Sequence, residues 1–191
     1  MTRSKASNAT ERLAVDFANT VACPGCRGGD ALVSAEQASR WIRRKLPGEG
    51  IRVDAHDVEM LRRFRIELRR LLQVAVDRKQ PPTAAVEAIN RAAARSPSHW
   101  TLRWTRGRWV AQELGTERSA TRRVIALTAR SAIDLLGKNS PTPVRRCEGP
   151  GCIHFLVAQR SQQRWCSPTG CGNRARVQRH YRKIRARLRT G

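Results

Sequence analysis

Four cysteines near the C-terminus of this 191-residue chain form two equally spaced pairs. The first pair is Cys147 and Cys152, the second is Cys166 and Cys171, and each pair encloses four residues that include Pro and Gly. Thirteen residues separate the two pairs. This spacing is typical of two short loops that each present two thiolates to one tetrahedral metal ion, because the segment between them can fold back and bring the loops together.

Zinc is the metal that this ligand set favours. Soft thiolates at closed tetrahedral spacing select zinc, and four protein ligands leave no coordination position for a catalytic water. Iron could use the same ligands, but the two regular loops suit zinc better. Because the four cysteines complete the ligand set, we expect His154 on a hairpin surface and His180 on a helix surface. The prediction is one structural Zn²⁺ ion bound by Cys147, Cys152, Cys166 and Cys171.

The segments around these cysteines predict a small treble-clef-like zinc finger of knuckle, hairpin and helix. Ile153–Val157 is apolar and β-prone, and a helix-forming run follows Cys171. One narrow apolar stripe runs along that helix, made by Val177, Tyr181, Ile184 and Leu188. The run from Gly172 to Gly191 contains eight cations and no acidic residue. Eight like charges on one helix repel each other unless a polyanion neutralises them.

The composition of the whole chain also indicates a polyanionic partner. Lys and Arg total 38 against 15 Asp and Glu, which gives a formal net charge of +23. This excess is larger than solubility requires, and it favours DNA or RNA first and an anionic membrane second. The first ten residues are polar and no stretch reaches the roughly 18 apolar residues of a membrane span. We therefore expect a cytoplasmic, nucleoid-associated protein with reduced thiols and no membrane partner.

The rest of the chain is expected to form a mainly helical domain over residues 1–137. A linker at residues 138–144 contains Pro141 and Pro143, and the finger would occupy residues 145–191. The predicted fold class is therefore mainly α with a small β-hairpin (α+β). Apolar periodicity and capping residues predict helices near Leu13–Val21, after Ser34, over Asp54–Lys79, from Thr83 to about Ala94, and from Thr116 to Gly137.

A hairpin is predicted between Trp100 and Ala111. Trp100, Leu102 and Trp104 alternate with polar residues, and Thr105-Arg-Gly107 is a plausible turn. We expect the aromatic side chains to cover the helical core, because buried aromatic anchors are commoner than exposed ones. The alternative is that they stack on nucleic-acid bases.

A third cysteine pair, Cys23-Pro-Gly-Cys26, lies in a Gly-rich loop after the first predicted helix. Three interpretations stay open for it. The pair could be unliganded and stiffen the loop, it could be a redox switch, or it could be half of a second metal site.

Two segments of the chain resemble a known family. Cys171-Gly-Asn-Arg174, together with Arg164-Trp-Cys166 before it, is similar to the CGNR-type zinc finger. Leu13-Ala-Val-Asp-Phe-Ala-Asn-Thr20, followed by Asp30-Ala-Leu32, is similar to the ABATE domain that precedes this finger. Proteins of this kind are regarded as stress-responsive transcription regulators. The resemblance implies a DNA-binding finger joined to a helical domain that senses a signal or binds a ligand.

The resemblance also implies roles for single residues. The four cysteines would bind zinc, and Gly172 and Asn173 would support the finger, with Asn173 either as a helix cap or as the residue that orients a neighbouring loop. The chain departs from the family pattern in two places, because Ile153–Trp165 has no acidic residue and the family does not call for cysteines at 23 and 26. The cations expected to contact nucleic acid are Arg164, Arg174, Arg176, Arg179, Arg182, Lys183, Arg185 and Arg187.

Taken together, these features predict a zinc-dependent, DNA-binding transcription regulator that is not an enzyme. Its expected partners are double-stranded DNA, a second copy of the chain and a small-molecule effector. The first alternative is an RNA-binding or ribosome-associated zinc protein, since the same charge and metal would serve. The last alternative is a thiol redox protein that uses Cys23 and Cys26. No His–Asp–Ser or paired-carboxylate constellation stands out in the sequence.

Overall fold

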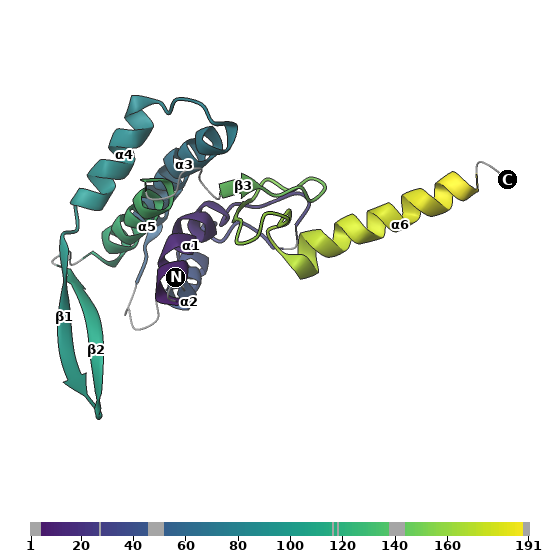
Figure 1. Cartoon of the computed structure of the whole chain (residues 1–191). Helices are drawn as coiled ribbons and strands as arrows, with labels where there is room; N and C mark the ends of the chain where they lie inside the picture. Colours follow the sequence, from purple (N-terminus) through teal and green to yellow (C-terminus); the bar gives the residue numbers. More distant parts are fainter. Residues whose placement is uncertain are drawn as a thin grey trace.

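The computed structural model describes residues 5–26, 28–45, 52–115, 117, 119–137 and 144–188. Its elements confirm the predicted α+β class, and none of its described helices is both long and apolar enough to cross a membrane. In chain order they are α1 (Lys5–Ala18), α2 (Ala35–Lys45), α3 (Ala55–Asp77), α4 (Thr83–Ala94), β1 (Ser98–Thr105), β2 (Arg108–Gly115), α5 (Ala120–Gly137), β3 (Val144–Arg146), β4 (Phe155–Val157), the π-helical turn η1 (Pro168–Gly172) and α6 (Asn173–Arg187) (Figure 1).

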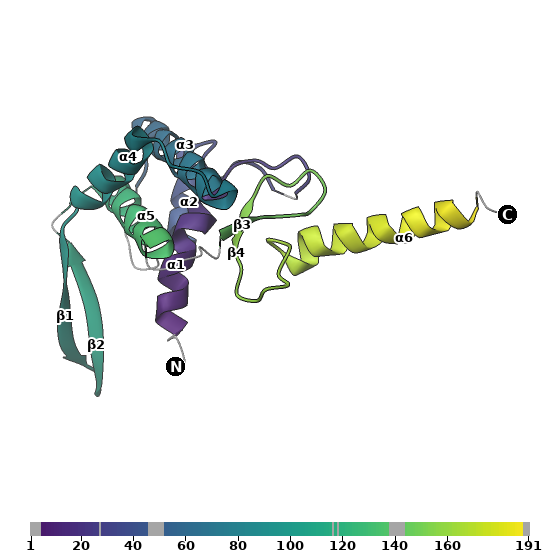
Figure 2. The same ribbon diagram turned by 45° about the horizontal axis from the view of Figure 1, so that its top comes forward.

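The first five helices pack around one apolar core, and α1 contacts α3 and α5 (Figures 1 and 2). Phe17 of α1 is fully buried, with its ring centroid 5.5 Å from that of Trp41 and 5.7 Å from that of Phe64. Small residues let α1 and α5 approach closely, and the Ala14 N–H donates a 2.9 Å hydrogen bond to Ser131 Oγ. The core therefore rests on the apolar stripes that the sequence pattern predicts.

The helix starts agree with the sequence in part. Asp54 closes a capping box with Asp57 at the start of α3, and Ser34 Oγ accepts from the Gln37 N–H at 3.3 Å. The predicted cap at Thr83 is wrong, because Thr83 is already helical and Pro82 holds the N-cap position. Proline is tolerated at the start of a helix, where its missing backbone N–H costs no intrahelical hydrogen bond. The predicted cap at Thr116 lies outside the described residues, and Ser119 instead accepts from the Arg122 N–H before α5.

The hairpin of β1 and β2 is confirmed, but its predicted packing is wrong. Its turn at Arg106 and Gly107 has positive φ at both positions, which suits a two-residue hairpin loop. The hairpin projects away from the helices instead of covering them (Figure 1). Trp104 and Trp109 are 59% and 67% exposed, and their rings contact each other edge to face at 5.0 Å. The base of the hairpin is tied to the helices, where Arg130 of α5 donates to Ser98 Oγ and to the Ser96 carbonyl. The exposed tip extends away from the core (Figure 1).

A buried ion pair joins α3 to the loop after α1. Arg65 is 8% exposed and donates two hydrogen bonds to the Asp30 carboxylate, at 2.6 and 2.8 Å, and a third to Thr20 Oγ1. Burial acts to raise the pKa of Asp30, but the hydrogen bonds from Arg65 and from the Leu32 N–H outweigh it and hold the pKa below its ordinary value. Asp30 and Thr20 belong to the motif that resembles ABATE, and in the structure both accept hydrogen bonds from Arg65 and so hold the loop after α1 to α3.

Replacing Arg65 by Met should lower the free energy of unfolding by about 2 kcal/mol, because the half-buried Asp30 carboxylate would lose both charged hydrogen bonds. Urea unfolding at neutral pH measures this. The matched control is Arg63→Met on the same helix, where the side chain is 78% exposed and forms a surface pair with Glu59, so the loss should stay near 0.5 kcal/mol. Equal losses in the two variants would contradict the role given to the buried pair.

The C-terminal segment packs directly on the helical domain. β3 pairs antiparallel with β4, with Val144 opposite Val157, and the side chains of Val144 and Phe155 are buried in the same core as the helices. Most of the predicted linker, residues 138–143, lies outside the described residues, and Val144 already belongs to β3. The hairpin predicted between the two cysteine pairs is wrong in its pairing, because β4 pairs with β3, which precedes the first cysteine pair.

Two side chains of the helical domain hold β4 and its neighbours. The Asn19 carboxamide forms a pair of hydrogen bonds with the Phe155 backbone, donating to its carbonyl and accepting from its N–H, each at 2.8 Å. Arg69 donates to the Ala18 carbonyl at 2.8 Å and to the Ile153 carbonyl at 2.9 Å, and its guanidinium lies 5.1 Å from the centroid of the Phe155 ring. We call these contacts of Asn19 and Arg69 the clamp.

An apolar pocket of about 470 Å³ lies between α3, α4 and α5. Its walls include Leu71 of α3, Ile89 of α4 and Ile133 of α5, with Lys79 and Asn90 as polar groups. This combination of size, apolar lining and few polar groups is typical of small-molecule sites.

Candidate metal centre and basic helix

The four cysteines near the C-terminus converge on one point. Their sulfur atoms all lie within 4.8 Å of one another, with Cys152 Sγ 3.9 Å from Cys166 Sγ and Cys166 Sγ 3.6 Å from Cys171 Sγ. Cys147 and Cys171 are buried, and the other two are half-buried. Four sulfur atoms at these separations surround a point at which a tetrahedral zinc ion would fit, since Zn–S bonds of about 2.3 Å place ligands roughly 3.8 Å apart.

The geometry of the first knuckle, residues 147–152, explains why glycine lies between its two cysteines. The Cys152 N–H donates to the Gly149 carbonyl at 2.9 Å and closes the turn. The N–H groups of Gly149 and Cys166 point at Cys147 Sγ, at 3.4 and 3.3 Å, as expected around a metal thiolate. A Cβ at Gly149 would lie 2.8 Å from Cys171 Cβ, so only glycine allows the two loops to close.

The four thiols cannot all ionise without a counter-charge. Hydrogen bonding from Cys166 and from nearby backbone N–H groups lowers the pKa of Cys147 to about 4. Burial, together with the charge that forms on Cys147, raises the pKa of Cys152 to about 11. One thiolate thus hinders the ionisation of its neighbours. A divalent cation at the centre removes this repulsion, which is why the ligand set suits a metal ion.

Arg174 supplies positive charge to the same cluster. Its Nη2 donates to Cys171 Sγ at 3.1 Å and lies 3.9 Å from Cys26 Sγ, and its Nε is buried without a hydrogen-bond partner among the described residues. The side chain therefore faces the sulfur atoms, whereas the sequence grouped it with the cations that contact nucleic acid. A guanidinium beside four thiolates offsets the negative charge that they would carry around one Zn²⁺ ion.

The basic helix begins at the metal cluster. Ser167 Oγ accepts from the Gly170 N–H at 3.0 Å and starts η1, which carries Cys171 and continues directly into α6. Gly172 is buried against Trp165, with the ring 3.5 Å from where its Cβ would lie. Asn173 is exposed, and its backbone N–H donates to the Gly170 carbonyl. Ser167 therefore caps the turn, and Asn173, which the resemblance implies as a helix cap, is the first residue of α6.

Helix α6 projects away from the rest of the molecule in both views (Figures 1 and 2). The apolar stripe predicted along it is exposed, from 39% at Ile184 to 78% at Leu188. Lys183 and Arg187 lie within α6, but their side chains are outside the described set. The cations with exposed side chains are Arg176, Arg179, Arg182 and Arg185.

Arg164 lies apart from these cations. It forms an ion pair with Glu148, between the cysteines of the first knuckle, and its guanidinium is 5.9 Å from the centroid of the Trp165 ring. It thus ties the third cysteine's segment to the first knuckle. The segment between the cysteine pairs, Ile153–Trp165, has no acidic residue, and Glu148 of the first knuckle is the acidic partner of Arg164.

The third cysteine pair also reaches the metal cluster, which sequence reasoning did not predict. Cys23 and Cys26 are joined by a disulfide, and Cys26 Sγ lies 3.5 Å from Cys152 Sγ. His154 is half-buried instead of lying on a hairpin surface, because its ring reaches from the segment before β4 to the loop after α1. The sequence offered two local signals, Cys23-x-x-Cys26 and Cys152-x-His154, but no spacing rule links them, since Cys26 and Cys152 are 126 positions apart.

Two protein-family models match successive parts of the chain. The model for ABATE, described as "Putative stress-induced transcription regulator", matches residues 11–139. The model for the CGNR zinc finger matches residues 144–184, which contain all four cysteines of the candidate site. None of the curated proteins compared with the chain matches it.

Proposed function

The chain belongs to the ABATE family and carries a CGNR zinc finger, and from this premise we propose that it is a zinc-dependent regulator of transcription that binds double-stranded DNA through α6. The metal has a structural role in this proposal. Cys147, Cys152, Cys166 and Cys171 would hold one Zn²⁺ ion, which would supply a rigid tetrahedral link between the knuckle and the start of α6.

The exposed arginines of α6 are the observation that carries this proposal. Arg176, Arg179, Arg182 and Arg185 are exposed on a helix that contains no acidic residue and extends into solvent (Figure 1). A helix of this width fits the major groove of B-DNA, where arginines can reach phosphates and guanine edges. The cluster of sulfur atoms lies at the base of α6, so zinc would fix the direction in which the charges point.

The test is the salt dependence of binding to a 30-base-pair duplex of random sequence, for zinc-loaded wild type and for Arg179→Gln/Arg182→Gln/Arg185→Gln. If each of these arginines neutralises one phosphate, the triple variant should reduce the slope of log affinity against log salt by about 3. Affinity at low salt should fall by roughly 10- to 1,000-fold, because each lost contact releases one counterion fewer.

The matched control removes the same net charge elsewhere. Arg40, Arg63 and Arg91 are exposed on α2, α3 and α4, and each pairs with a Glu four residues before it. Arg40→Gln/Arg63→Gln/Arg91→Gln should leave the slope close to that of wild type. Equal slopes for the two triple variants would mean that α6 is not the binding element.

The second candidate function is binding of single-stranded or structured RNA, which the exposed hairpin favours. Trp104 and Trp109 present ring surface to solvent at the tip of β1 and β2, and exposed aromatic rings are what bases stack on. Competition of duplex DNA by structured RNA at fixed salt separates the two functions. A preference for RNA that is lost in Trp104→Ala would favour this second candidate.

A further inference from the structure

The loop of the third cysteine pair is built against the zinc finger. The Gly25 N–H donates to the Gly151 carbonyl at 3.2 Å, and Cys23 Sγ lies 3.7 Å from the same carbonyl oxygen. A Cβ at Gly25 would lie 2.3 Å from the Pro150 carbonyl oxygen, so glycine is required for this approach. Two glycine-containing turns that are far apart in the sequence therefore meet backbone to backbone and bring their cysteines together.

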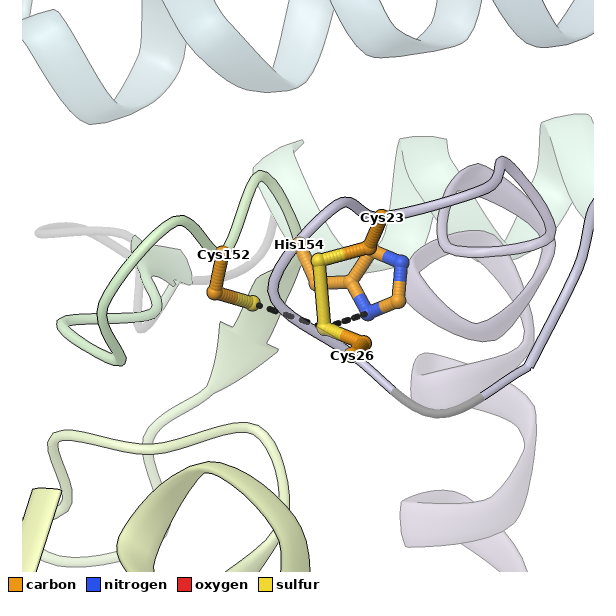
Figure 3. A group of neighbouring side chains, drawn as sticks. All are labelled: Cys23, Cys26, Cys152 and His154. Carbon is orange, nitrogen blue, oxygen red and sulfur yellow. Dashed lines mark hydrogen bonds between the residues drawn. A yellow bond between two sulfur atoms is a disulfide. The ribbon is translucent and has the colours of Figure 1, made fainter. Parts of the chain in front are cut away.

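Four potential metal ligands surround one point at this junction. Figure 3 shows Cys26 Sγ between Cys152 Sγ, at 3.5 Å, and His154 Nδ1, at 3.9 Å. With Cys23 Sγ, these ligand atoms all lie within 4.8 Å of one another. Once the Cys23–Cys26 bond is reduced, these three sulfur atoms and one imidazole nitrogen form a ligand set typical of structural zinc.

The hydrogen bond on the far side of the His154 ring is an independent sign of metal binding. His154 Nε2 lies 3.2 Å from the Val21 carbonyl oxygen, which can only accept, so Nε2 carries the ring proton. Nδ1 then has a free lone pair, and it faces the sulfur atoms (Figure 3). Metal-binding histidines are oriented in this way, with the second ring nitrogen donating to a backbone carbonyl or a carboxylate.

We propose that Cys23, Cys26, Cys152 and His154 bind a second Zn²⁺ ion, and that Cys152 bridges it to the zinc of the four-cysteine site. Cys152 is the one residue common to both groups of ligands, and its sulfur lies between Cys26 Sγ at 3.5 Å and Cys166 Sγ at 3.9 Å. The inference rests on zinc occupying the four-cysteine site, and it raises the expected count from one ion to two.

The second site exists only in the dithiol form of the protein. In this structure Cys23 and Cys26 form a disulfide, so two of the four ligands are joined to each other. A dithiol reductant donates two electrons and two protons, which converts the disulfide to two thiols while the reductant becomes a disulfide. Zinc then replaces both thiol protons, which go to solvent. Cys26 also lies 3.9 Å from Arg174 Nη2, so the second ion would adjoin the start of α6.

Metal analysis of the full chain tests this proposal. Protein purified with a dithiol reductant and then dialysed should contain two zinc ions per chain, and Cys23→Ser/Cys26→Ser should contain one. Cobalt substitution gives a second readout, because the wild type should take up two Co²⁺ ions, the second lacking in the variant. One ion per chain in both proteins would overturn the second site and leave the four-cysteine site standing. No ion in wild type would overturn both.

Cys23 is 4% exposed, so the double variant could fail to fold. A second experiment therefore uses oxidation of the wild type. Adding a low-molecular-weight disulfide to reduced, zinc-loaded protein should re-form the Cys23–Cys26 bond and release one zinc ion per chain, detected with a chromogenic chelator. Re-formation of the bond, verified by mass spectrometry, without release of zinc would contradict the proposal.

Discussion

Replacing Cys171 by Ser should remove the zinc ion of the four-cysteine site and reduce affinity for a selected duplex by at least about 100-fold. Structural zinc contributes about 10 kcal/mol or more to the folding of a small finger, and a serine hydroxyl is a poor zinc ligand. Cys171 is 2% exposed and lies in η1, immediately before α6, so its loss would release the start of the basic helix. Without a fixed start, α6 keeps its charge and hence only non-specific binding, which is typically 10³-fold or more weaker than specific binding.

The experiment uses the duplex that zinc-loaded wild type enriches from a random library, with zinc per chain measured on the same samples. Cys171→His is the matched control, since histidine is itself a zinc ligand, and it should retain zinc and more of the affinity than Cys171→Ser. Chelation of the wild type followed by addition of zinc should reproduce both states in one protein. Full zinc content and unchanged affinity in Cys171→Ser would show that this cysteine is not a ligand.

The four-cysteine cluster could be predicted from the sequence because its information is local. Each pair lies within one turn, and the short segment between the pairs allows few arrangements. Cys23, Cys26 and His154 could not be placed in this way, because they meet only after α1 and β4 pack against each other. Proximity between residues more than 100 positions apart is a property of the tertiary fold, and no spacing rule expresses it.

The sequence also could not predict the roles of side chains whose function depends on where they point. In the sequence, Arg174 cannot be told apart from the other arginines of the basic run. In the structure its side chain turns back to Cys171 Sγ at 3.1 Å, while Arg176 and Arg179 are exposed. The hairpin of β1 and β2 was predictable from alternation and turn residues, but whether it packs on the core depends on where its base is attached. Periodicity indicates which residues share a face, and tertiary contacts decide what that face meets.

The motif that resembles ABATE contains a residue whose role the structure makes specific. Asn19 forms two hydrogen bonds with the Phe155 backbone, as a neighbouring strand would, and Arg69 binds carbonyl groups on both sides of the same junction. Asn19→Ala/Arg69→Met should therefore lower the free energy of unfolding by roughly 4 kcal/mol, at about 1 kcal/mol for each of the four hydrogen bonds. The finger would then lose its fixed orientation on the helical domain, although the sulfur atoms of the four-cysteine site are untouched.

Urea unfolding measures the total loss, and hydrogen exchange at the Phe155 amide locates it, since Asn19 Oδ1 accepts from that N–H. Asn90→Ala/Arg70→Met is the matched control, because both residues are exposed on the helical domain and Arg70 forms a surface pair with Glu67. Asn19→Asp separates hydrogen bonding from shape. It keeps the acceptor for the Phe155 N–H but places an oxygen against the Phe155 carbonyl, so it should destabilise at least as much as Asn19→Ala despite its nearly identical size. If Asn19→Asp were as stable as wild type, the clamp would be a packing contact and its hydrogen bonds would not hold the finger.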